Sequence, residues 1–377
     1  MASQLGASVR ATAAVLRAPG GRFSIEPVIL DALRENEVLV RIVASGICHT
    51  DLSAREQLLP LRLPAVLGHE GSGVVEAVGA KVTSVRPGDH VVTSFDFCGD
   101  CDSCRDCHVA YCQHAPRLNF SGVRRDGTGV VHDEQRSVLS ARFLGQSSFA
   151  SHANVSESSV VRIDRDVPLE LMGPLGCGMQ TGAGTVLNVL KPRPGSSIAI
   201  LGAGSVGFAA LMAARIAGCE TIIAVDINDA RLTLARELGA TDTFNALSGD
   251  PVEFVRIATK GRGVHSSVEC TGLPAVLRQA VDVLAPRGTC ALVGVAHPRA
   301  DAAINMASML RGRTLVGVTE GDVVPRTFIP QMIEWWREGR FPFDRLVRYF
   351  EFARIDEAVA ACASGEVVKP VVRMGGG

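Results

Sequence analysis

A glycine-rich turn between an apolar run and a helical pattern constrains the fold of this chain more than any other segment. Gly202-Ala203-Gly204-Ser205-Val206-Gly207 follows the apolar residues 197–201 and opens a helical pattern over 206–217. In this context the first glycine permits a tight turn, the second lets the backbone approach a pyrophosphate, and the third lets helix and strand pack closely. The helix N-terminus favours phosphate there. The pattern predicts a dinucleotide site made by Gly202, Gly204, Ser205, Val206 and Gly207.

An acidic residue follows at the spacing that such a site requires. The next predicted strand, residues 221–226, ends in Asp226, twenty-two residues beyond Gly204. A carboxylate in this place accepts hydrogen bonds from ribose hydroxyls and repels a 2′-phosphate, so it favours NAD over NADP. A tight turn without a ligand is the alternative interpretation, and the accompanying strand, helix and acid argue against it.

The rhythm of predicted elements changes along the chain. Residues 10–155 contain short β-rich runs between turns, which indicate a compact, β-barrel-like half. From about residue 180 strands and helices alternate, which indicates a parallel, doubly wound sheet. An amphipathic helical pattern at 328–337 precedes a final strand at 367–372, which we expect to return to the first half. A length of 377 residues exceeds what one core usually serves, so two domains are expected.

Charge and hydropathy exclude several classes of function. The formal net charge is -1, so no basic excess favours nucleic acid or an anionic membrane. Residues 198–218 approach membrane-spanning length, but their glycines fit a strand, a turn and a buried helix better. The N-terminus lacks the pattern of a secretion signal. We expect a cytoplasmic protein without nucleic-acid or membrane partners, whose eleven cysteines bind metal or lie buried as thiols.

Four cysteines form a compact metal-binding pattern. Their spacing is Cys98-x2-Cys101-x2-Cys104-x7-Cys112, which offers the four thiolates of a closed, tetrahedral structural zinc site. A cysteine-rich surface loop that oxidises is the alternative. Cys107 lies within the pattern and, with Cys104 and His108, also matches a haem-attachment motif. Haem attachment requires export, so we leave Cys107 outside the zinc site.

A second group of ligands is scattered along the chain. Cys48, His69 and Cys177 each lie among glycines, and two thiolates with one imidazole leave a position open on a catalytic zinc ion. Their separations are too long for spacing alone to assign them, and each residue taken singly fits a buried thiol or a core histidine. Asp51 is available to orient His69. Glu70 is either an exchanging fourth ligand or a solvated or salt-bridged acid.

Taken together, these motifs resemble the zinc-dependent medium-chain alcohol dehydrogenases over residues 37–373. The resemblance is closest to the aryl-alcohol (benzyl-alcohol) dehydrogenases. The segments that carry it are Gly46-Ile47-Cys48-His49-Thr50-Asp51, Gly68-His69-Glu70-Gly71, Pro87-Gly88-Asp89, the four-cysteine pattern, Gly176-Cys177-Gly178, the glycine motif with Val225-Asp226, Phe143-Leu144-Gly145-Gln146-Ser147-Ser148-Phe149, Pro174–Gly184 and Phe341-Pro342-Phe343.

The resemblance implies an α/β fold with a GroES-like β-barrel catalytic domain and a Rossmann cofactor domain. The catalytic domain, with one catalytic and one structural zinc site, is expected at residues 1–180 and 325–377, and the NAD-binding domain at 181–324. It further implies a homodimer or homotetramer that associates through the strand around residues 314–318.

The resemblance also implies roles for individual residues. Thr50 takes the alcohol proton, and Ser53 stands where many relatives end the relay on histidine. His49 faces the pyrophosphate, and a solvated loop histidine is its alternative. Arg231, Lys369, Val293 and Gly294 are placed at the cofactor, where the first two are alternatively surface charges. Phe95 and Phe149 are placed at the substrate, with core packing as the alternative.

The function that these patterns indicate is NAD-dependent, reversible oxidation of a primary aromatic or allylic alcohol to its aldehyde. The same chemistry on aliphatic, terpenoid or ω-hydroxy acid alcohols is the first alternative. A protein that binds nucleotide and zinc without catalysis is a remote one, because no open-site ligand is missing and Thr50 is present.

Overall fold

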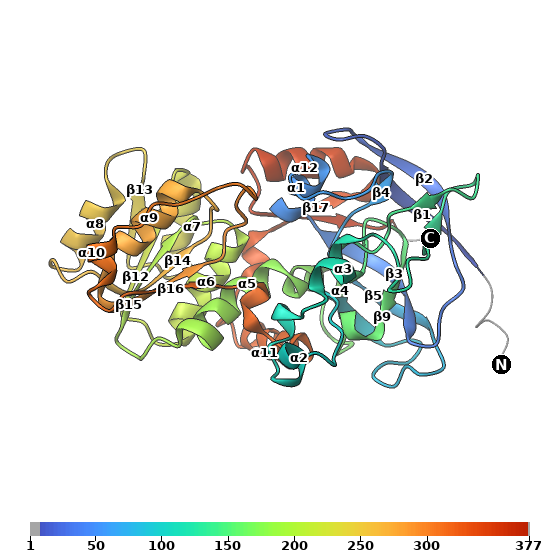
Figure 1. Ribbon diagram of the computed structural model, residues 1–377, viewed down its shortest axis with the longest axis horizontal. Coiled ribbons are helices and arrows are strands. Elements are labelled where there is room, and N and C mark those ends of the chain that lie inside the picture. The colour runs from blue at the N-terminus through green and yellow to red at the C-terminus, as the bar shows by residue number, and fades with distance from the viewer. Residues whose placement is uncertain (1–7, 376–377) are drawn as a thin grey trace. The chain divides into compact units, whose positions relative to one another are not determined.

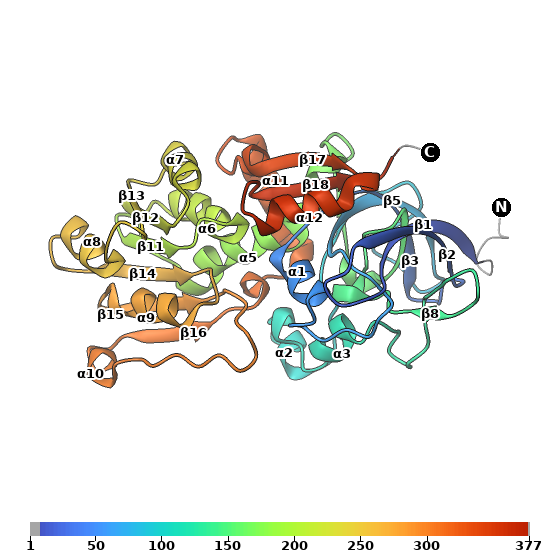
Figure 2. The same cartoon turned by 90° about the horizontal axis from the view of Figure 1, so that it is seen from above.

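The computed structural model describes residues 8–375 and divides them into two compact units. We name residues 8–177, 324–331 and 344–375 the barrel unit, and residues 178–323 and 332–343 the sheet unit. Residues 8 and 375, the first and last that are described, belong to the barrel unit, and Figures 1 and 2 show the elements of each unit from two directions.

The barrel unit is built from two mostly antiparallel sheets. The first has the order β4-β1-β2-β7-β8, and its strands are β4 (Ala65–Val66), β1 (Val9–Leu16), β2 (Phe23–Leu30), β7 (Val131–His132) and β8 (Val138–Leu139). The second has the order β10-β6-β5-β3-β18-β17, with β9 (His152–Ser156) also paired to β3. Its other strands are β10 (Val160–Ile163), β6 (His90–Thr93), β5 (Glu70–Val78), β3 (Glu37–Gly46), β18 (Lys369–Arg373) and β17 (Val347–Glu351). The β-rich organisation expected for residues 10–155 is confirmed.

Short helices and loops of the barrel unit carry the predicted ligands. The helices are α1 (His49–Arg55), α2 (Asp102–Arg105), α3 (Ala115–Phe120), α4 (Leu169–Met172) and α12 (Ile355–Ala363). The strand β3 is buried along most of its length because it pairs with β5, β9 and β18, which explains its run of valine, leucine and isoleucine. The strand β18 confirms that the end of the chain returns to this half.

The sheet unit is a six-stranded, all-parallel sheet of the order β13-β12-β11-β14-β15-β16. The strands are β13 (Asp242–Asn245), β12 (Thr221–Asp226), β11 (Ser197–Leu201), β14 (Val264–Glu269), β15 (Leu284–Leu292) and β16 (Thr314–Gly317). The helices are α5 (Gly178–Gly184), α6 (Ser205–Ile216), α7 (Asp229–Glu237), α8 (Pro251–Ala258), α9 (Pro274–Asp282) and α10 (Met306–Met309). The chain crosses from one side of the sheet to the other between β13 and β14, so the topological switch point lies between β11 and β14, where Rossmann sheets bind dinucleotides.

One expected domain boundary differs from the structure. The expectation assigned all of residues 325–377 to the catalytic domain, whereas residues 332–343 pack with the sheet unit. The helix α11 (Pro325–Arg337) therefore contributes to both units. The reason is apolar burial, because Met332, Phe341 and Phe343 are each 0% exposed. Sequence periodicity marked the helix but could not show where its apolar face would pack.

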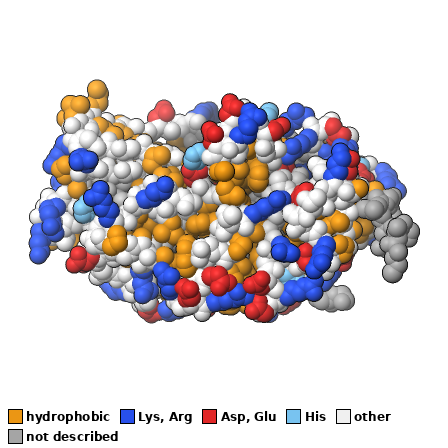
Figure 3. Space-filling view, turned by 90° about the horizontal axis from the view of Figure 1, so that it is seen from below, with side chains coloured by type: hydrophobic (Ala, Val, Ile, Leu, Met, Phe, Trp, Pro, Cys, Tyr) orange, Lys and Arg blue, Asp and Glu red, His pale blue; other side chains and the backbone are white. Residues whose placement is uncertain are grey.

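Two expected exclusions can be compared with the structure. Among the described residues no helix is long and apolar enough to cross a membrane, and residues 198–218 form β11, the glycine turn and α6 instead. On the face drawn in Figure 3, acidic and basic side chains are intermingled and no continuous basic surface is present.

Candidate metal centres and nucleotide site

The scattered ligands meet in the barrel unit. The ligand atoms of Cys48, His69, Glu70 and Cys177 all lie within 4.8 Å of one another. Cys48 precedes α1, His69 precedes β5, and Cys177 ends a 3-10 turn at Gly173–Gly176. Three separate local structures therefore bring two thiols and one imidazole together, which confirms the convergence that spacing alone could not establish.

Asp51 orients His69 as expected. The Nδ1 atom of His69 lies 2.9 Å from Oδ1 of Asp51, and both side chains are 1% exposed. The backbone amides of Cys48 and Gly68 donate to the same carboxylate at 2.9 and 3.1 Å. The Nε2 atom of His69 is buried and has no hydrogen-bond partner among the described residues. A buried, unpartnered nitrogen beside two thiols is the arrangement expected where a metal ion binds, so the residues fit a zinc site.

The surrounding charges shift the pKa values of His69 and Cys48 in opposite directions. Burial disfavours the charged imidazole, but the Asp51 carboxylate outweighs it and raises the pKa of His69 well above its usual range. A more basic imidazole is a stronger ligand once metal displaces its proton. A hydrogen bond with Cys177 lowers the pKa of Cys48, and burial opposes this effect. The neighbouring His69 and Lys369 lower the pKa further, so that it lies well below its usual range. Thiolate is the form that binds zinc.

Glu70 and Lys369 form a buried ion pair beside this cluster. The Nζ atom of Lys369 lies 2.8 Å from both carboxylate oxygens of Glu70 and donates to the carbonyl of Ile47 at 3.1 Å. Burial disfavours the charge of Lys369, and the Glu70 carboxylate more than offsets this and raises the pKa of Lys369. The salt-bridged interpretation of Glu70 is confirmed, and its exchange onto a metal ion stays a prediction.

Lys369 differs from its expected role. These three contacts use the three hydrogens of its ammonium group, and the side chain is 1% exposed. It is therefore neither a surface charge nor an ammonium group directed at a phosphate, because the buried carboxylate attracts it more strongly than solvent does. A phosphate contact would require the ion pair to open.

The expected relay residues lie on α1. The hydroxyl of Thr50 is 3.7 Å from the sulfur of Cys48, so it stands at the edge of the ligand cluster. Ser53 is one helical turn further on and half-buried, and His49 is exposed at the first position of the helix. The relay and the pyrophosphate contact of His49 stay predictions.

The two expected substrate residues differ in their surroundings. Phe149 is 0% exposed and packs edge-on against Phe23 with ring centroids 5.9 Å apart. A Cβ on Gly68 would lie 2.4 Å from the Phe149 ring, so this ring packs behind the segment that carries His69. These contacts therefore show that Phe149 packs in the core. Phe95 is 5% exposed, and its substrate contact stays a prediction.

Sequence reasoning missed a residue that holds the His69 segment. The amide nitrogen of Gln146 donates to the carbonyl of His69 at 2.8 Å, and its oxygen accepts from the amide of Gly71 at 3.2 Å and from the hydroxyl of Thr93. Gln146 is 1% exposed. The only indication in the sequence was its place in the segment 143–149, which carried part of the family resemblance.

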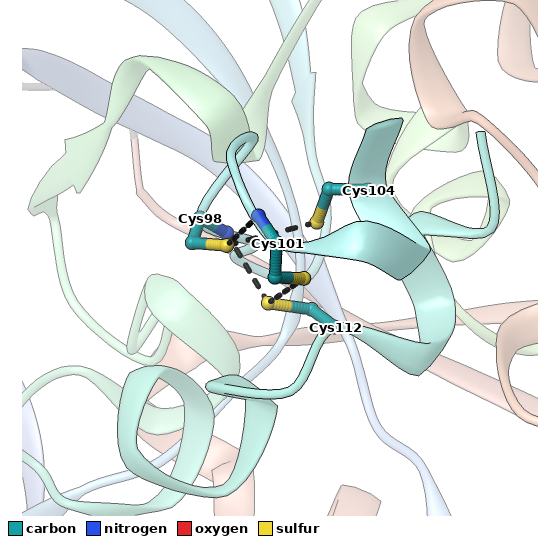
Figure 4. A group of neighbouring side chains, drawn as sticks. All are labelled: Cys98, Cys101, Cys104 and Cys112. Carbon is teal, nitrogen blue, oxygen red and sulfur yellow. Dashed lines mark hydrogen bonds between the residues drawn. The ribbon is translucent and has the colours of Figure 1, made fainter. Parts of the chain in front are cut away.

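The four-cysteine lobe also has the geometry of a zinc site. Figure 4 shows the four sulfurs of Cys98, Cys101, Cys104 and Cys112 directed toward a common centre, and all lie within 4.8 Å of one another. The sulfur of Cys98 lies 3.8 Å from that of Cys104, and the sulfur of Cys101 lies 4.0 Å from that of Cys112. Tetrahedral zinc with bonds of about 2.3 Å requires sulfurs about 3.8 Å apart. Cys107 is exposed and outside the group, as expected, and none of the eleven cysteines, all of which lie within residues 8–375, forms a disulfide.

The glycine turn of the sheet unit has the backbone form that a dinucleotide site needs. Gly202 has a φ of +103°, which L side chains rarely adopt. A Cβ on Gly207 would lie 1.9 Å from the carbonyl oxygen of Gly202, so strand and helix can approach only at glycine. A Cβ on Gly204 would meet nothing within 4 Å, which leaves its space open for a ligand. Ser205 and Val206 begin α6, whose N-terminus is expected to face phosphate.

Asp226 is fixed beside this turn. Its carboxylate accepts hydrogen bonds from the amides of Ala203, Ile227 and Asn228 at 2.6, 2.8 and 2.9 Å. Arg231 lies 4.0 Å away and is mostly buried rather than a surface charge. The structure thus places a carboxylate at the end of β12 where the sequence predicted one.

Comparisons with known proteins identify the family. The family model described as zinc-binding dehydrogenase matches residues 205–338, and the one described as alcohol dehydrogenase GroES-like domain matches residues 34–165. This chain therefore belongs to the zinc-dependent medium-chain alcohol dehydrogenases. No particular substrate follows from that membership alone.

Individual relatives cover nearly the whole chain. Geraniol dehydrogenase of Castellaniella defragrans is 45% identical over 97% of this chain and 98% of its own length. The crystal structure of benzyl alcohol dehydrogenase from Acinetobacter calcoaceticus is 42% identical with a TM-score of 0.94, over 97% of this chain and all of that one. An alcohol dehydrogenase zinc-binding domain protein from Burkholderia ambifaria is 50% identical with a TM-score of 0.96, over 98% and 100%.

Proposed function

We propose that this alcohol dehydrogenase oxidises a primary allylic or aromatic alcohol reversibly to its aldehyde with NAD. The observation that carries the proposal is the buried Nε2 of His69, which lies close to two thiols and has no hydrogen-bond partner in the described part of the chain, while Asp51 holds the other ring nitrogen. The substrate class is supported by two similar proteins, one named for geraniol and one for benzyl alcohol. Geraniol is an allylic alcohol and benzyl alcohol an aromatic one, and both carry a π-system next to the carbinol carbon.

The residues of the barrel unit have distinct tasks in this chemistry. When bound, Zn²⁺ supplies a Lewis acid that lowers the pKa of the alcohol, and the nicotinamide accepts the hydride. Cys48, His69 and Cys177 would hold the metal ion and leave one position open. Asp51 fixes which nitrogen of His69 faces the ion, because it accepts a hydrogen bond from the other.

Thr50 is proposed to take the proton that the alcohol loses. Its hydroxyl lies 3.7 Å from the sulfur of Cys48, at the edge of the ligand cluster. Ser53 is three residues further along the same helix and so lies on the same face, where it offers the next hydroxyl of an exit path. A Thr50→Val variant should lose about 100-fold in kcat/KM, since positioned proton transfer contributes that much. Thr50→Ser keeps the hydroxyl and is the matched control.

The preference for NAD is proposed from Asp226. Three backbone amides hold its carboxylate beside the glycine turn, so its negative charge is fixed where a 2′-phosphate would approach. One structure of this fold, 23% identical, was solved with NADP, and similarity at that level extends to the fold only. Equal kcat/KM values for NAD and NADP would contradict the preference.

A substrate panel tests the function. Initial rates with benzyl alcohol, geraniol, hexanol and 6-hydroxyhexanoate are compared under NAD and under NADP, with the zinc content of the same sample measured. The proposal expects the first two alcohols to have the highest kcat/KM. Higher kcat/KM values for the aliphatic or ω-hydroxy acid alcohols would instead favour those alcohols as the substrate class. Absence of turnover by zinc-replete protein would refute the proposed function.

We also propose that two copies of this chain associate through β16. This strand is the edge of the six-stranded sheet, and a two-fold axis would let the strand pair with itself. Leu310 and Met306, in the segment just before β16, are 89% and 84% exposed. A Leu310→Asp variant should shift the mass measured by light scattering toward the monomer. Leu247→Asp, at a position 76% exposed in the same unit, is the control.

A further inference from the structure

A fully buried carboxylate stands at the switch point of the sheet unit. Glu269 is the last residue of β14 and is 0% exposed. The neighbouring strand β11 runs directly into the glycine turn, and a Cβ on Gly202 would lie 2.9 Å from the side chain of Thr271, two residues after Glu269. The carboxylate therefore lies at the edge of the crevice where a parallel sheet of this order binds a dinucleotide.

The side chain of Glu269 holds the loop that follows β14. Its Oε1 atom accepts from the amides of Thr271 and Gly272 at 2.6 and 3.0 Å and from the hydroxyl of Thr271. Its Oε2 atom accepts from the amide of Gly272 at 3.2 Å. All these partners are donors, so the side chain acts here purely as an acceptor, and hydrogen bonds to a carboxylate are stronger than those to a neutral oxygen.

The same residue also holds the end of the next strand. The backbone carbonyl of Glu269 accepts from the amides of Val293 and Gly294 at 2.9 and 3.0 Å. A Cβ on Gly294 would lie 2.0 Å from the amide nitrogen of Gly272 and 2.8 Å from Oε2 of Glu269. A Cβ on Gly272 would lie 2.4 Å from the carbonyl oxygen of Val295. The two loops thus touch backbone to backbone, with the carboxylate packed against their contact.

We infer that Glu269 is a positioning residue for the cofactor, which it affects without touching. It fixes the segments 271–272 and 293–294, which lie after β14 and β15 in the half of the sheet that receives the second mononucleotide of a dinucleotide. The inference rests on the proposed use of NAD. Loss of the carboxylate lets both loops move, so cofactor binding must order them again and affinity falls.

Glu269→Gln tests the inference because it keeps the shape of the side chain and removes its charge. The new amide nitrogen would face the amide of Gly272, so two donors would oppose each other. We expect the Kd for NADH, measured by nucleotide fluorescence, to rise about tenfold or more. A tenfold rise corresponds to a loss of about 1.4 kcal/mol of binding free energy. The KM for the alcohol and the zinc content should stay at wild-type values. Amide hydrogen exchange should quicken at residues 271, 272, 293 and 294.

Two further variants keep the inference testable if Glu269→Gln folds poorly. Thr271→Val removes the hydroxyl that donates to Glu269 and accepts from the amide of Leu273, and it should raise the Kd about threefold or more, as loss of about one or two hydrogen bonds implies. Gly294→Ala forces the loops apart without changing charge and should raise the Kd at least as much as Glu269→Gln. Glu253→Gln, an exposed carboxylate on α8 of the same unit, is the matched control and should bind like the wild type.

The outcomes separate the inference from the proposed function. If wild-type protein binds neither NADH nor NADPH, the proposed function and the inference both fail. If wild-type protein binds NADH and Glu269→Gln binds it within twofold of Glu253→Gln, only the inference fails. If Glu269→Gln lowers the thermal midpoint but leaves the Kd for NADH unchanged, Glu269 has a structural role alone and the inference is also overturned.

Discussion

Replacement of Asp51 by asparagine should weaken one zinc site and leave the other intact. The Asp51 carboxylate accepts from His69 Nδ1 at 2.9 Å and from the amides of Gly68 and Cys48 at 3.1 and 2.9 Å. An asparagine oxygen can retain the first two contacts, but its amide nitrogen would then face the Cys48 amide, donor against donor. His69 would also lose the charge that raises its basicity. Loss of such a partner weakens metal binding about 10- to 100-fold, which is about 1.4–2.8 kcal/mol.

The assay is competition for zinc with a chromophoric chelator. The four-cysteine site is a separate group of ligands in the same unit, so its ion is an internal reference. Asp126→Asn removes an exposed carboxylate that pairs with Arg34, and it should change neither affinity. If the same chelator concentration removes the more weakly bound zinc ion from Asp51→Asn and from the wild type, the argument that Asp51 strengthens zinc binding through His69 is refuted. Equal weakening of both ions would show a general loss of folding instead.

Three further predictions follow from single contacts. Glu37 is 3% exposed and binds Arg124 through two hydrogen bonds, so Glu37→Gln should lower the free energy of unfolding in urea by about 3–5 kcal/mol. Burial raises the pKa of Glu37, but the arginines outweigh it and lower that pKa, so this stabilisation is present above about pH 4.3 and is lost as pH falls through the folded-state value. Gly204→Ala should keep the thermal midpoint and lose NADH affinity at least tenfold, whereas Gly207→Ala, whose Cβ would meet a carbonyl oxygen at 1.9 Å, should lower both. Cys107→Ala should keep the full zinc content, and loss of half of it would place that thiol in the site.

The sheet unit was the more predictable half because its signals are local. Residues 197–201 and 221–226 form β11 and β12 with the bounds expected from their apolar runs. Gly202, Gly204 and Gly207 take three different environments that match the three reasons for glycine in such a turn. Each of these signals is complete within about 30 residues, so the sequence carries it without knowledge of the rest of the fold.

The contacts around the scattered metal ligands were less predictable because they depend on charge and hydrogen bonding across the fold. The Lys369–Glu70 ion pair joins residues 299 positions apart, and Gln146 reaches the carbonyl of His69 across 77 positions. Neither pairing has a spacing rule. A lysine near the end of the chain looks like a surface residue until the antiparallel pairing of β18 with β3 places it beside the first residue of β5.

Apart from the family resemblance, the glycines were the indication in the sequence that the ligand segments approach closely. A Cβ on Gly173 would lie 2.2 Å from the carbonyl oxygen of Glu70, and one on Gly176 would lie 2.1 Å from the carbonyl oxygen of Thr93. The turn that carries Cys177 can therefore pack onto β5 and β6 only because these positions lack side chains. On the other side, a Cβ on Gly46 would lie 2.0 Å from the Glu70 carboxylate. The glycines beside each ligand thus mark backbone-to-backbone packing, and that packing brings distant ligands within reach of one metal ion.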